Sequence, residues 1–399
     1  MGGLSLASLL LGAPVLLVTG YLGVLALLAR RPRPPEYGPP SVAFAVVVPA
    51  HNEEENIAKT VESLLALDYP RERFEVVVVA DNCSDATAER AREAGARVLE
   101  RSDDVRRGKG YALEHAFDLL LEEARADAFV VVDADTVVSA NLLRAFAHRL
   151  EAGESAVQAE YGVSNVNASW RTQLMTLALA MFHDVRSLAR ERLKLSAGLR
   201  GNGMCFSRAL LEAHPHKAYG LVEDVEYGIA IGLHGHRVAY AFEAEVLGEM
   251  VSGGRGAATQ RKRWEGGRLA LFRSRFFTLL RCAVERRDAV CLDLALDLAV
   301  PPLSYVGLLV SFGLVVEAIL FVRSGGTPTP SLAVWALSLP ALFAYVARGV
   351  QHAGLGARGW LVLSWAPVYV AWKLLLVRPW RRERRWIRTE REAERRSGE

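Results

Sequence analysis

Two acidic residues separated by one position, Asp133 and Asp135, follow a run of four apolar residues at 129–132. Their carboxylates therefore emerge where a buried strand reaches solvent. Carboxylate oxygens are the hard ligands that Mg²⁺ or Mn²⁺ prefers, and an ion held there can neutralise a diphosphate leaving group. The spacing indicates a metal-assisted site, although a plain Asp-rich turn after a strand has the same sequence.

Asp81 follows a second expected strand, at 75–80, which is apolar after its first residue, and it precedes Ser84 and Asp85. Those two residues can cap the next helix, so capping alone would explain the polar cluster. Asp81 stands before the cap and beside the other strand ends, which favours contact with a nucleotide base. Lys109, in an Arg-Gly-Lys-Gly sequence, can reach a phosphate or the acidic cluster, or it can remain a solvated loop lysine.

Glu223 and Asp224 open an amphipathic segment whose apolar side carries Val225, Ile229 and Leu233. Acids in the first turn of a helix usually compensate the helix dipole. The catalytic alternative is that Asp224 removes the proton of an acceptor hydroxyl as a general base.

Residues 260–264 place an amide, a guanidinium and an indole, from Gln260, Arg263 and Trp264, on one patch of a helix. A guanidinium can hold a diphosphate, and an aromatic face can close over a sugar or a base. The same string also suits a basic stripe at a membrane surface, because residues 257–280 combine Arg, Trp and Phe with little acid.

Strands and helices alternate around these motifs. Asn52 is expected to cap the first helix, with Glu55 at its third position. Strands that alternate with helices predict a mostly parallel α/β sheet, whose ligands bind at the carboxyl ends of the strands. The strands are expected at 42–48, 75–80, 97–99 and 129–132, and the later helices at 85–94, 109–124 and 169–193.

In this order the motifs resemble the D, DxD, (T/E)D, QxxRW series of membrane-bound family 2 glycosyltransferases. That group includes bacterial cellulose, hyaluronan, chitin and poly-N-acetylglucosamine synthases. The resemblance covers residues 42–275. The residues of this chain that match the family's motifs are Pro49-Ala50-His51-Asn52-Glu53, Asp81, Asp133-x-Asp135, Glu223-Asp224 and Gln260-x-x-Arg263-Trp264.

The resemblance implies a GT-A fold, which is Rossmann-like with a mostly parallel sheet, and an inverting transfer from a UDP-sugar with Mg²⁺ or Mn²⁺. It implies Asp81 at the base, Asp133 at the ribose and metal, Asp135 as the direct metal ligand, and Glu223 and Asp224 as catalytic residues. The other residues expected at the donor are Pro49, His51, Glu53, Lys109, Gln260, Arg263 and Trp264. Gly201, Asn202 and Gly203 match the acceptor-side segment of the family.

Two features depart from the family. Val222 stands where Thr is usual, and the C-terminal apolar region is shorter than in long-chain synthases, which puts polymer translocation in doubt.

The apolar residues gather at the two ends of the chain, so a catalytic domain flanked by transmembrane helices is expected. Residues 4–29 have spanning length, with neither a basic region before them nor a convincing cleavage site after them, so a cleaved signal peptide is the minor alternative. The expected divisions are an anchor at 1–30, a Pro-rich linker at 31–41, the catalytic domain at 42–256, an interfacial region with the QxxRW motif at 257–288, a transmembrane region at 289–377 and an Arg-rich cytosolic tail at 378–399.

The C-terminal apolar runs lie at 298–322, 331–349 and 359–377. Three spans would place the Arg-rich tail outside the cell, against the positive-inside bias, so the Trp-rich run at 359–377 is expected to be interfacial or re-entrant. Asp293 and Asp297 are expected on a surface helix. Glu317 lies deeper and is expected to face neighbouring helices, with Arg348 as its candidate partner.

Arginines after the first span place residue 30 onward in the cytosol, at the inner or plasma membrane.

The main functional prediction is a glycosyltransferase of exopolysaccharide or cell-surface polysaccharide synthesis, and the alternative is a lipid glycosyltransferase of the ceramide glucosyltransferase type. A third hypothesis, a scaffold with a dead site, is weakened because all the expected acids are present. The expected partners are a UDP-sugar, a saccharide or lipid-linked acceptor and the bilayer. The net charge of +3 gives no reason to expect nucleic acid, and the four cysteines lack zinc or disulfide spacing.

Overall fold

The computed structural model describes the 399-residue chain except residues 1–2, 252–253 and 376–399, so the Arg-rich tail lies outside the described part. Its centre is an eight-stranded sheet in the order β3-β2-β1-β4-β7-β6-β8-β5. Strands β1 to β4 pair in parallel, whereas β7 runs antiparallel to both of its neighbours and β5 antiparallel to β8. The bounds are β1 Phe44–Ala50, β2 Phe74–Asp81, β3 Arg97–Arg101, β4 Ala128–Val131, β5 Thr136–Val138, β6 Ala156–Val163, β7 Met204–Ser207 and β8 Val238–Gly248.

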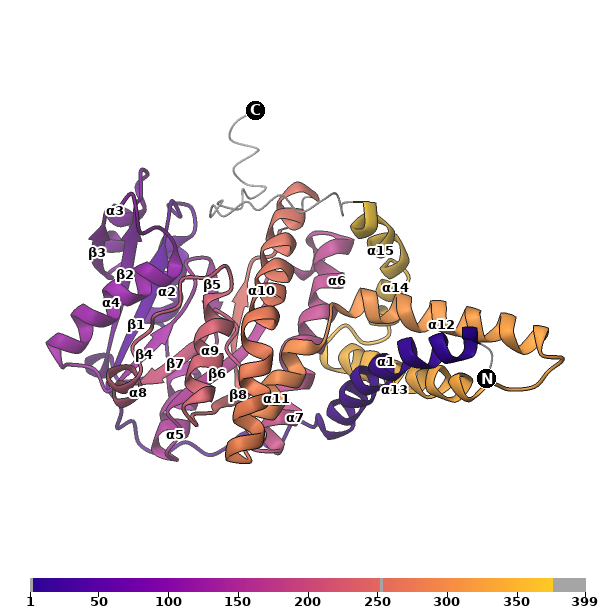
Figure 1. Ribbon diagram of the computed structural model, residues 1–399. Helices are drawn as coiled ribbons and strands as arrows, with labels where there is room; N and C mark the ends of the chain where they lie inside the picture. Colours follow the sequence, from indigo (N-terminus) through magenta and orange to yellow (C-terminus); the bar gives the residue numbers. More distant parts are fainter. Residues whose placement is uncertain (1–2, 252–253, 376–399) are drawn as a thin grey trace.

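Helices cover both faces of this sheet (Figure 1). One apolar core joins the sheet to α2 (Ile57–Leu65), α3 (Thr87–Glu93) and α5 (Leu142–Glu151). The other joins it to α4 (Lys109–Glu123), α8 (Arg208–Ala213) and α9 (Glu223–Leu233). Because the central strands are buried on both faces, their sequences are continuous apolar runs, and the predicted GT-A-like α/β class is confirmed.

The first helix after β1, α2, begins later than the sequence predicts. Asn52 adopts a left-handed backbone with φ of 56°, and α2 starts at Ile57 after Asn56. The cap expected at Asn52 is therefore wrong. Its side-chain oxygen instead accepts a hydrogen bond from the backbone N–H of Ser84 at 2.8 Å, which ties the loop after β1 to the loop after β2.

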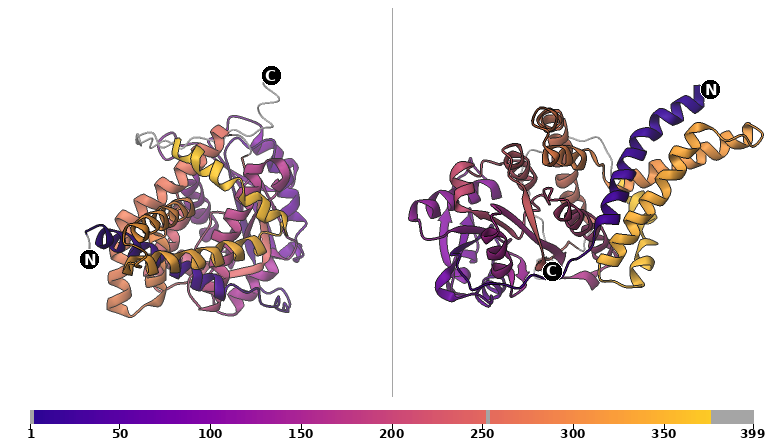
Figure 2. Two further views of the ribbon diagram at one scale, coloured as in Figure 1. Left: turned by 90° about the vertical axis from the view of Figure 1, so that its right-hand side faces the viewer. Right: turned by 90° about the horizontal axis from the view of Figure 1, so that it is seen from below.

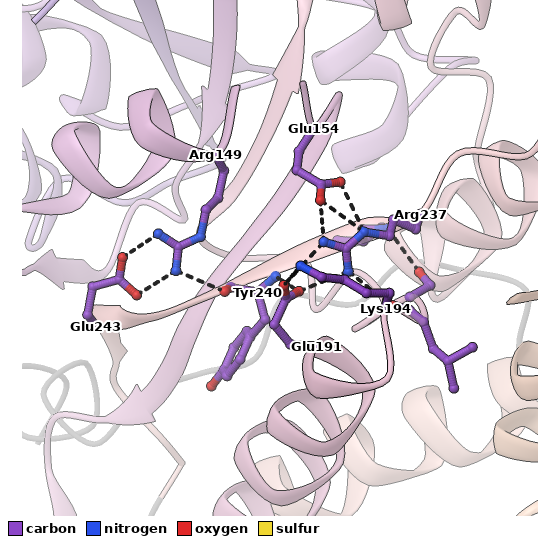
Figure 3. Close-up of polar contacts among 10 residues, drawn as sticks. Arg149, Glu154, Glu191, Lys194, Arg237, Tyr240 and Glu243 are labelled. Atoms are coloured by element: carbon purple, nitrogen blue, oxygen red, sulfur yellow. Dashed lines mark hydrogen bonds and ion pairs between the residues drawn. The ribbon is translucent and has the colours of Figure 1, made fainter. Parts of the chain in front are cut away.

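The helical segment expected at 169–193 is α6 (Trp170–Leu179), a π-helical turn at Ala180–Val185 and α7 (Arg186–Arg192). Ion pairs fix α7 to the sheet (Figure 3). Arg237, at the start of β8, bonds both Glu191 of α7 and Glu154, and Arg149 of α5 bonds Glu243 of β8 at 2.6 Å. The side chains of α7 are thereby held in place behind the sheet.

Three described helices are long and apolar enough to cross a membrane: α1 (Gly3–Leu28), α12 (Leu303–Arg323) and α13 (Pro330–His352). They extend together from the α/β domain, with α1 beside α13 (Figure 2). Gly23 of α1 allows close approach, because a Cβ there would lie 3.2 Å from the Cβ of Ala341. Large apolar side chains such as Leu17 and Phe312 remain exposed on these helices, as expected for surfaces that face lipid.

The run at 359–377 forms two short helices, α14 (Arg358–Leu363) and α15 (Ala366–Leu375), rather than one spanning helix. Glu317 faces neighbouring helices as predicted, since it accepts hydrogen bonds from Ser8 of α1 and from Thr329. The prediction that Arg348 is its partner is wrong, because the guanidinium group of Arg348 donates to the carbonyl oxygen of Ala26.

The long helix α10 (Gly254–Arg286) crosses the molecule between the sheet and the membrane helices and is followed by α11 (Ala289–Ala299). The thiols of Cys282 and Cys291 lie 3.0 Å apart where these helices meet.

The predicted surface position of Asp293 and Asp297 on α11 is wrong. Both are buried, because they pair with arginines that α7 contributes from more than a hundred residues away in sequence.

Candidate active site

The strand ends bring together residues that the sequence predicts for donor binding. Asp81, the last residue of β2, is 6% exposed and accepts a hydrogen bond from Arg101 of β3 at 2.6 Å. The Nδ1 atom of His51, just after β1, lies 2.7 Å from the carbonyl oxygen of Asp81. The parallel register of β1, β2 and β3 therefore brings these side chains to one carboxyl edge, as the alternation of strands and helices predicts.

Lys109, the first residue of α4, links this edge to the glycine turn at Gly201. Its ammonium group lies 2.5 Å from Oδ1 of Asp133, 2.6 Å from the carbonyl oxygen of Gly201 and 3.9 Å from Oε1 of Glu223. Burial by itself would lower the pKa of Lys109, but Asp133 and Glu223 outweigh it and the pKa is raised. The lysine is therefore a fixed positive charge among acids and not a solvated loop side chain.

Asn202 and Gly203 lie beneath the site. Asn202 is fully buried, accepts from the backbone N–H of Asp133 at 3.1 Å and donates to Thr136 at 2.8 Å. Gly203 has φ of 68°, and a Cβ there would lie 2.7 Å from the side chain of Val246. Both residues thus hold the strand end that carries Asp133, while Gly201 faces the site beside Asp224.

Asp133 and Asp135 provide oxygen donors that fit Mg²⁺ or Mn²⁺. Lys109 already bonds Oδ1 of Asp133, so an ion at this position would share that carboxylate with an ammonium group. Glu249 is an acid that the sequence motifs miss. β5 pairs with β8 so that Thr136 lies opposite Gly248, which places Glu249 next to Asp135 at the same cavity wall.

Glu223 and Asp224 begin α9 beside the glycine turn. A Cβ at Gly201 would lie 3.4 Å from Oδ2 of Asp224. Burial raises the pKa of Glu223 from 4.5 to about 7, against the opposing charge of Lys109. Burial also raises the pKa of Asp224, while the N–H of Val225, Lys109 and Arg200 oppose that rise. Two acids with raised pKa values in a cleft fit proton transfer better than simple compensation of a helix dipole.

α10 positions the residues of the QxxRW motif over this site. Gln260, Arg263 and Trp264 all line the same cavity as the acids. The helix lies close to the start of α9, since a Cβ at Gly267 would be 2.8 Å from the side chain of Val222. Trp264 also packs with Val163 and Met250, so it has a structural contact as well as a position at the cavity wall.

One cavity of ≈ 2140 Å³ contains the whole set. At one end it is lined by the acids of the strand ends, and Asp224 lies along its wall. At the other end its walls are apolar and come from the membrane helices and the segments beside them, with Leu308 of α12, Leu342 and Val346 of α13 and Leu363 of α14. A polar site at a sheet edge therefore opens directly toward the helices that can cross a bilayer.

The fold and the acidic strand ends define a GT-A-like domain joined to long apolar helices. Residues 39–267 match the family model described as glycosyltransferase like family 2, and the chain belongs to this family.

Similar proteins support this assignment. A β-monoglucosyldiacylglycerol synthase from Synechocystis is 29% identical over 269 residues, which cover 63% of this chain and 55% of that protein. A probable glucomannan 4-β-mannosyltransferase from Arabidopsis thaliana is 26% identical over 250 residues, with 60% and 45% covered. The chain thus spans about half the length of the curated relatives it matches.

Among solved structures, the fold is similar to that of the mannosyltransferase PcManGT from Pyrobaculum calidifontis in complex with GDP-Man and Mn²⁺. The TM-score is 0.54 at 18% identity, and the match covers 85% of this chain and 99% of that one.

Proposed function

We propose that this protein transfers a hexose from a nucleotide sugar, a UDP-sugar, to a lipid acceptor with inversion at the anomeric carbon. The observation that carries the proposal is the continuity of the cavity from Asp133 and Asp135, past Asp224, to the apolar walls of α12 and α13. A water-soluble donor can enter at the acidic end, and an acceptor with an apolar tail can enter from the bilayer.

At the donor end, His51 and Asp81 receive the base, and Asp133 receives the ribose. Asp133 and Asp135 would hold Mg²⁺ or Mn²⁺, which supplies charge neutralisation for the diphosphate when it is bound. Pro49 and Glu53 complete this wall, and Gln260, Arg263 and Trp264 close over the diphosphate from α10. Closing excludes water from the reacting centre, which strengthens each of these electrostatic contacts.

At the acceptor end, Asp224 takes the proton from the acceptor hydroxyl. The oxygen then forms its bond to the anomeric carbon from the face opposite the diphosphate, and the bond to the diphosphate oxygen breaks. Glu223 and Lys109 set the charge around Asp224, because the ammonium group lies 3.9 Å from Glu223 and contributes to the pKa of Asp224.

A lipid acceptor is supported by the relatives as well as by the cavity, because the Synechocystis protein is a lipid glycosyltransferase by name. A polysaccharide acceptor, the main prediction from sequence, is supported by the similarity to the glucomannan mannosyltransferase. The apolar end of the cavity, beside α12 and α13, favours the lipid.

The experiment is a transfer assay on purified full-length protein with Mn²⁺ and a panel of labelled UDP-sugars and GDP-mannose. Diacylglycerol, ceramide, phosphatidic acid and oligosaccharides serve as separate acceptors. With UDP-sugars as donors, we expect the labelled sugar to appear in the organic phase because it has been transferred to a lipid. A water-soluble product that lengthens with time would support the polysaccharide function instead, and no transfer to any lipid would refute the proposal.

Membrane placement belongs to the same proposal. We infer that α1, α12 and α13 anchor the protein in the inner or plasma membrane with the catalytic domain in the cytosol, where nucleotide sugars are available. The arginines after α1 support this orientation. Reaction of a cysteine introduced at Glu36 with a membrane-impermeant reagent in intact cells would contradict it.

A further inference from the structure

Three arginines surround one aromatic ring between the catalytic acids and the membrane helices. The guanidinium carbons of Arg200, Arg186 and Arg268 lie 4.5, 4.7 and 5.1 Å from the centre of the Phe182 ring. Phe182 belongs to the π-helical turn, a rare irregularity that occurs frequently at functional sites. All four residues line the large cavity.

This arginine cluster carries more positive than negative charge. Arg190 joins it from α7. Two carboxylates, those of Asp293 and Asp297, form ion pairs with Arg186, Arg190 and Arg268, whereas Arg200 has no ion pair among the described residues. Asp297 serves three of the arginines, with contacts of 2.8 Å to Arg186, 2.7 Å to Arg190 and 3.5 Å to Arg268. Buried charge without a full counter-charge is costly unless a ligand supplies it.

Three nitrogen atoms of the cluster lack hydrogen-bond partners among the described residues: Nε of Arg190, Nε of Arg200 and Nη1 of Arg268. Nε of Arg190 still lies 2.9 Å from Oδ2 of Asp293, which leaves Arg200 and Arg268 with the nitrogens that no carboxylate approaches. Arg200 is only 8% exposed, and its other contacts are to the carbonyl of Ala197 and, through its backbone N–H, to Gln158. A buried donor without a hydrogen-bond partner is costly, and more so when it is charged. Both side chains line the cavity, so an anion there can supply the counter-charge that the two guanidinium groups lack.

The cluster lies between the proposed base and the membrane. Arg200 acts electrostatically on Asp224. On the opposite side, Arg186 donates to the hydroxyl of Tyr345 on α13 at 2.9 Å. The apolar wall of α13, with Leu342 and Val346, continues from there. An acceptor that enters from the bilayer therefore meets the arginine cluster before it meets Asp224.

We propose that Arg200 and Arg268 bind the phosphate of an anionic lipid acceptor, whose headgroup hydroxyl reaches Asp224 and whose acyl or prenyl chain lies against α12 and α13. The inference rests on the proposed transfer to a lipid and names the acceptor class: lipids that carry a phosphate next to the accepting hydroxyl. The donor diphosphate is a second source of phosphate chemistry. Lys109 and Arg263 also line the cavity and are available to that diphosphate, so competition with UDP distinguishes the two sources.

The test is calorimetry on the purified full chain in detergent, with two short-chain probes that differ only in the phosphate, dihexanoylphosphatidic acid and dihexanoylglycerol. The phosphate probe is expected to bind at least about tenfold more tightly, the gain typical of one hydrogen bond to a charged group. Arg200→Gln and Arg268→Gln should each remove most of that preference. Arg273→Gln, at an exposed position on α10, the helix that also carries Arg268, is the matched control. This variant should bind the two probes as the wild type does.

Equal binding of the two probes to the wild type would overturn the inference, and this comparison needs no variant to fold. Competitive displacement of the phosphate probe by UDP with Mn²⁺ would also overturn it, because the cluster would then serve the donor. Inorganic phosphate that binds as tightly as the lipid would overturn it as well. Selective binding without sugar transfer to any lipid would instead refute the proposed function and leave the anion site standing.

Discussion

The ammonium group of Lys109 lies 2.5 Å from Oδ1 of Asp133 and 2.6 Å from the carbonyl oxygen of Gly201. One side chain thus connects the first acid of the DxD motif to the glycine turn against which Asp224 lies. Because each of these groups is on a different segment of the chain, Lys109 couples the position of the DxD acid to that of the turn beside Asp224.

Replacement of Lys109 by Gln should shift the pH dependence of turnover. Lys109 opposes the rise in the pKa values of Glu223 and Asp224, so its removal raises both further. The acid limb of the kcat profile should then move to higher pH. Lys194→Gln, at an exposed lysine paired with Glu191, should leave the limb in place. An unchanged limb in Lys109→Gln would show that the lysine does not act on the catalytic acids.

Asp135→Asn should remove metal-dependent donor binding, and Asp133→Asn should weaken it less. Asp133 already shares one oxygen with Lys109, whereas Asp135 lies next to Glu249 at the cavity wall. Calorimetry of UDP with and without Mn²⁺ measures the effect. Asp118→Asn, at an exposed acid on α4, is the control. Metal-dependent UDP affinity equal to that of the wild type in Asp135→Asn would exclude Asp135 as a ligand.

The parallel half of the sheet and the acids at its edge could be predicted because the information is local. Each buried strand is a continuous apolar run, and each run ends at a polar residue such as Asp81 or Asp133. The register of parallel strands then brings those ends together whatever the loops do. The start of α2 could not be predicted, because Asn52 takes a left-handed backbone to bond the loop after β2.

The other half of the site depends on contacts between distant segments. Glu249 lies next to Asp135 only because β5 and β8 pair antiparallel, and β5, with three residues, is too short to have a distinctive pattern. Asp297 resembles an acid on a surface helix in sequence, since the arginines that bury it come from α7. The sequence around a charged residue does not indicate whether its side chain is solvated by water or pairs with a residue of another segment.

Asp297→Asn should destabilise the folded protein strongly. The change leaves Arg186, Arg190 and Arg268 with less counter-charge in a buried position, a loss typically of about 3–5 kcal/mol. The fall in the thermal midpoint in detergent, followed by near-UV circular dichroism, measures it. Asp68→Asn breaks an ion pair with Arg144 in which Asp68 is 63% exposed, and it should cost at most about 1 kcal/mol. Equal midpoints for the two variants would contradict the structural role of the cluster.

Asp224→Asn should lower kcat by at least about 10², the lower bound for loss of general-base assistance, while UDP and metal affinity stay nearly unchanged. Asparagine keeps the shape of the side chain but cannot take the proton of the acceptor hydroxyl. Glu226→Gln is the matched control, because Glu226 lies in the same first turn of α9 and would share a role limited to the helix dipole.

The pH dependence separates the two roles further. Burial raises the pKa of Glu223 to about 7 and also raises that of Asp224 above its ordinary 3.8. A base works only when it is deprotonated, so activity should fall as the pH drops through the raised pKa of Asp224. The residual turnover of Asp224→Asn should lack this limb. If Asp224→Asn and Glu226→Gln both turn over at the wild-type rate, Asp224 is a structural acid and another group must accept the proton.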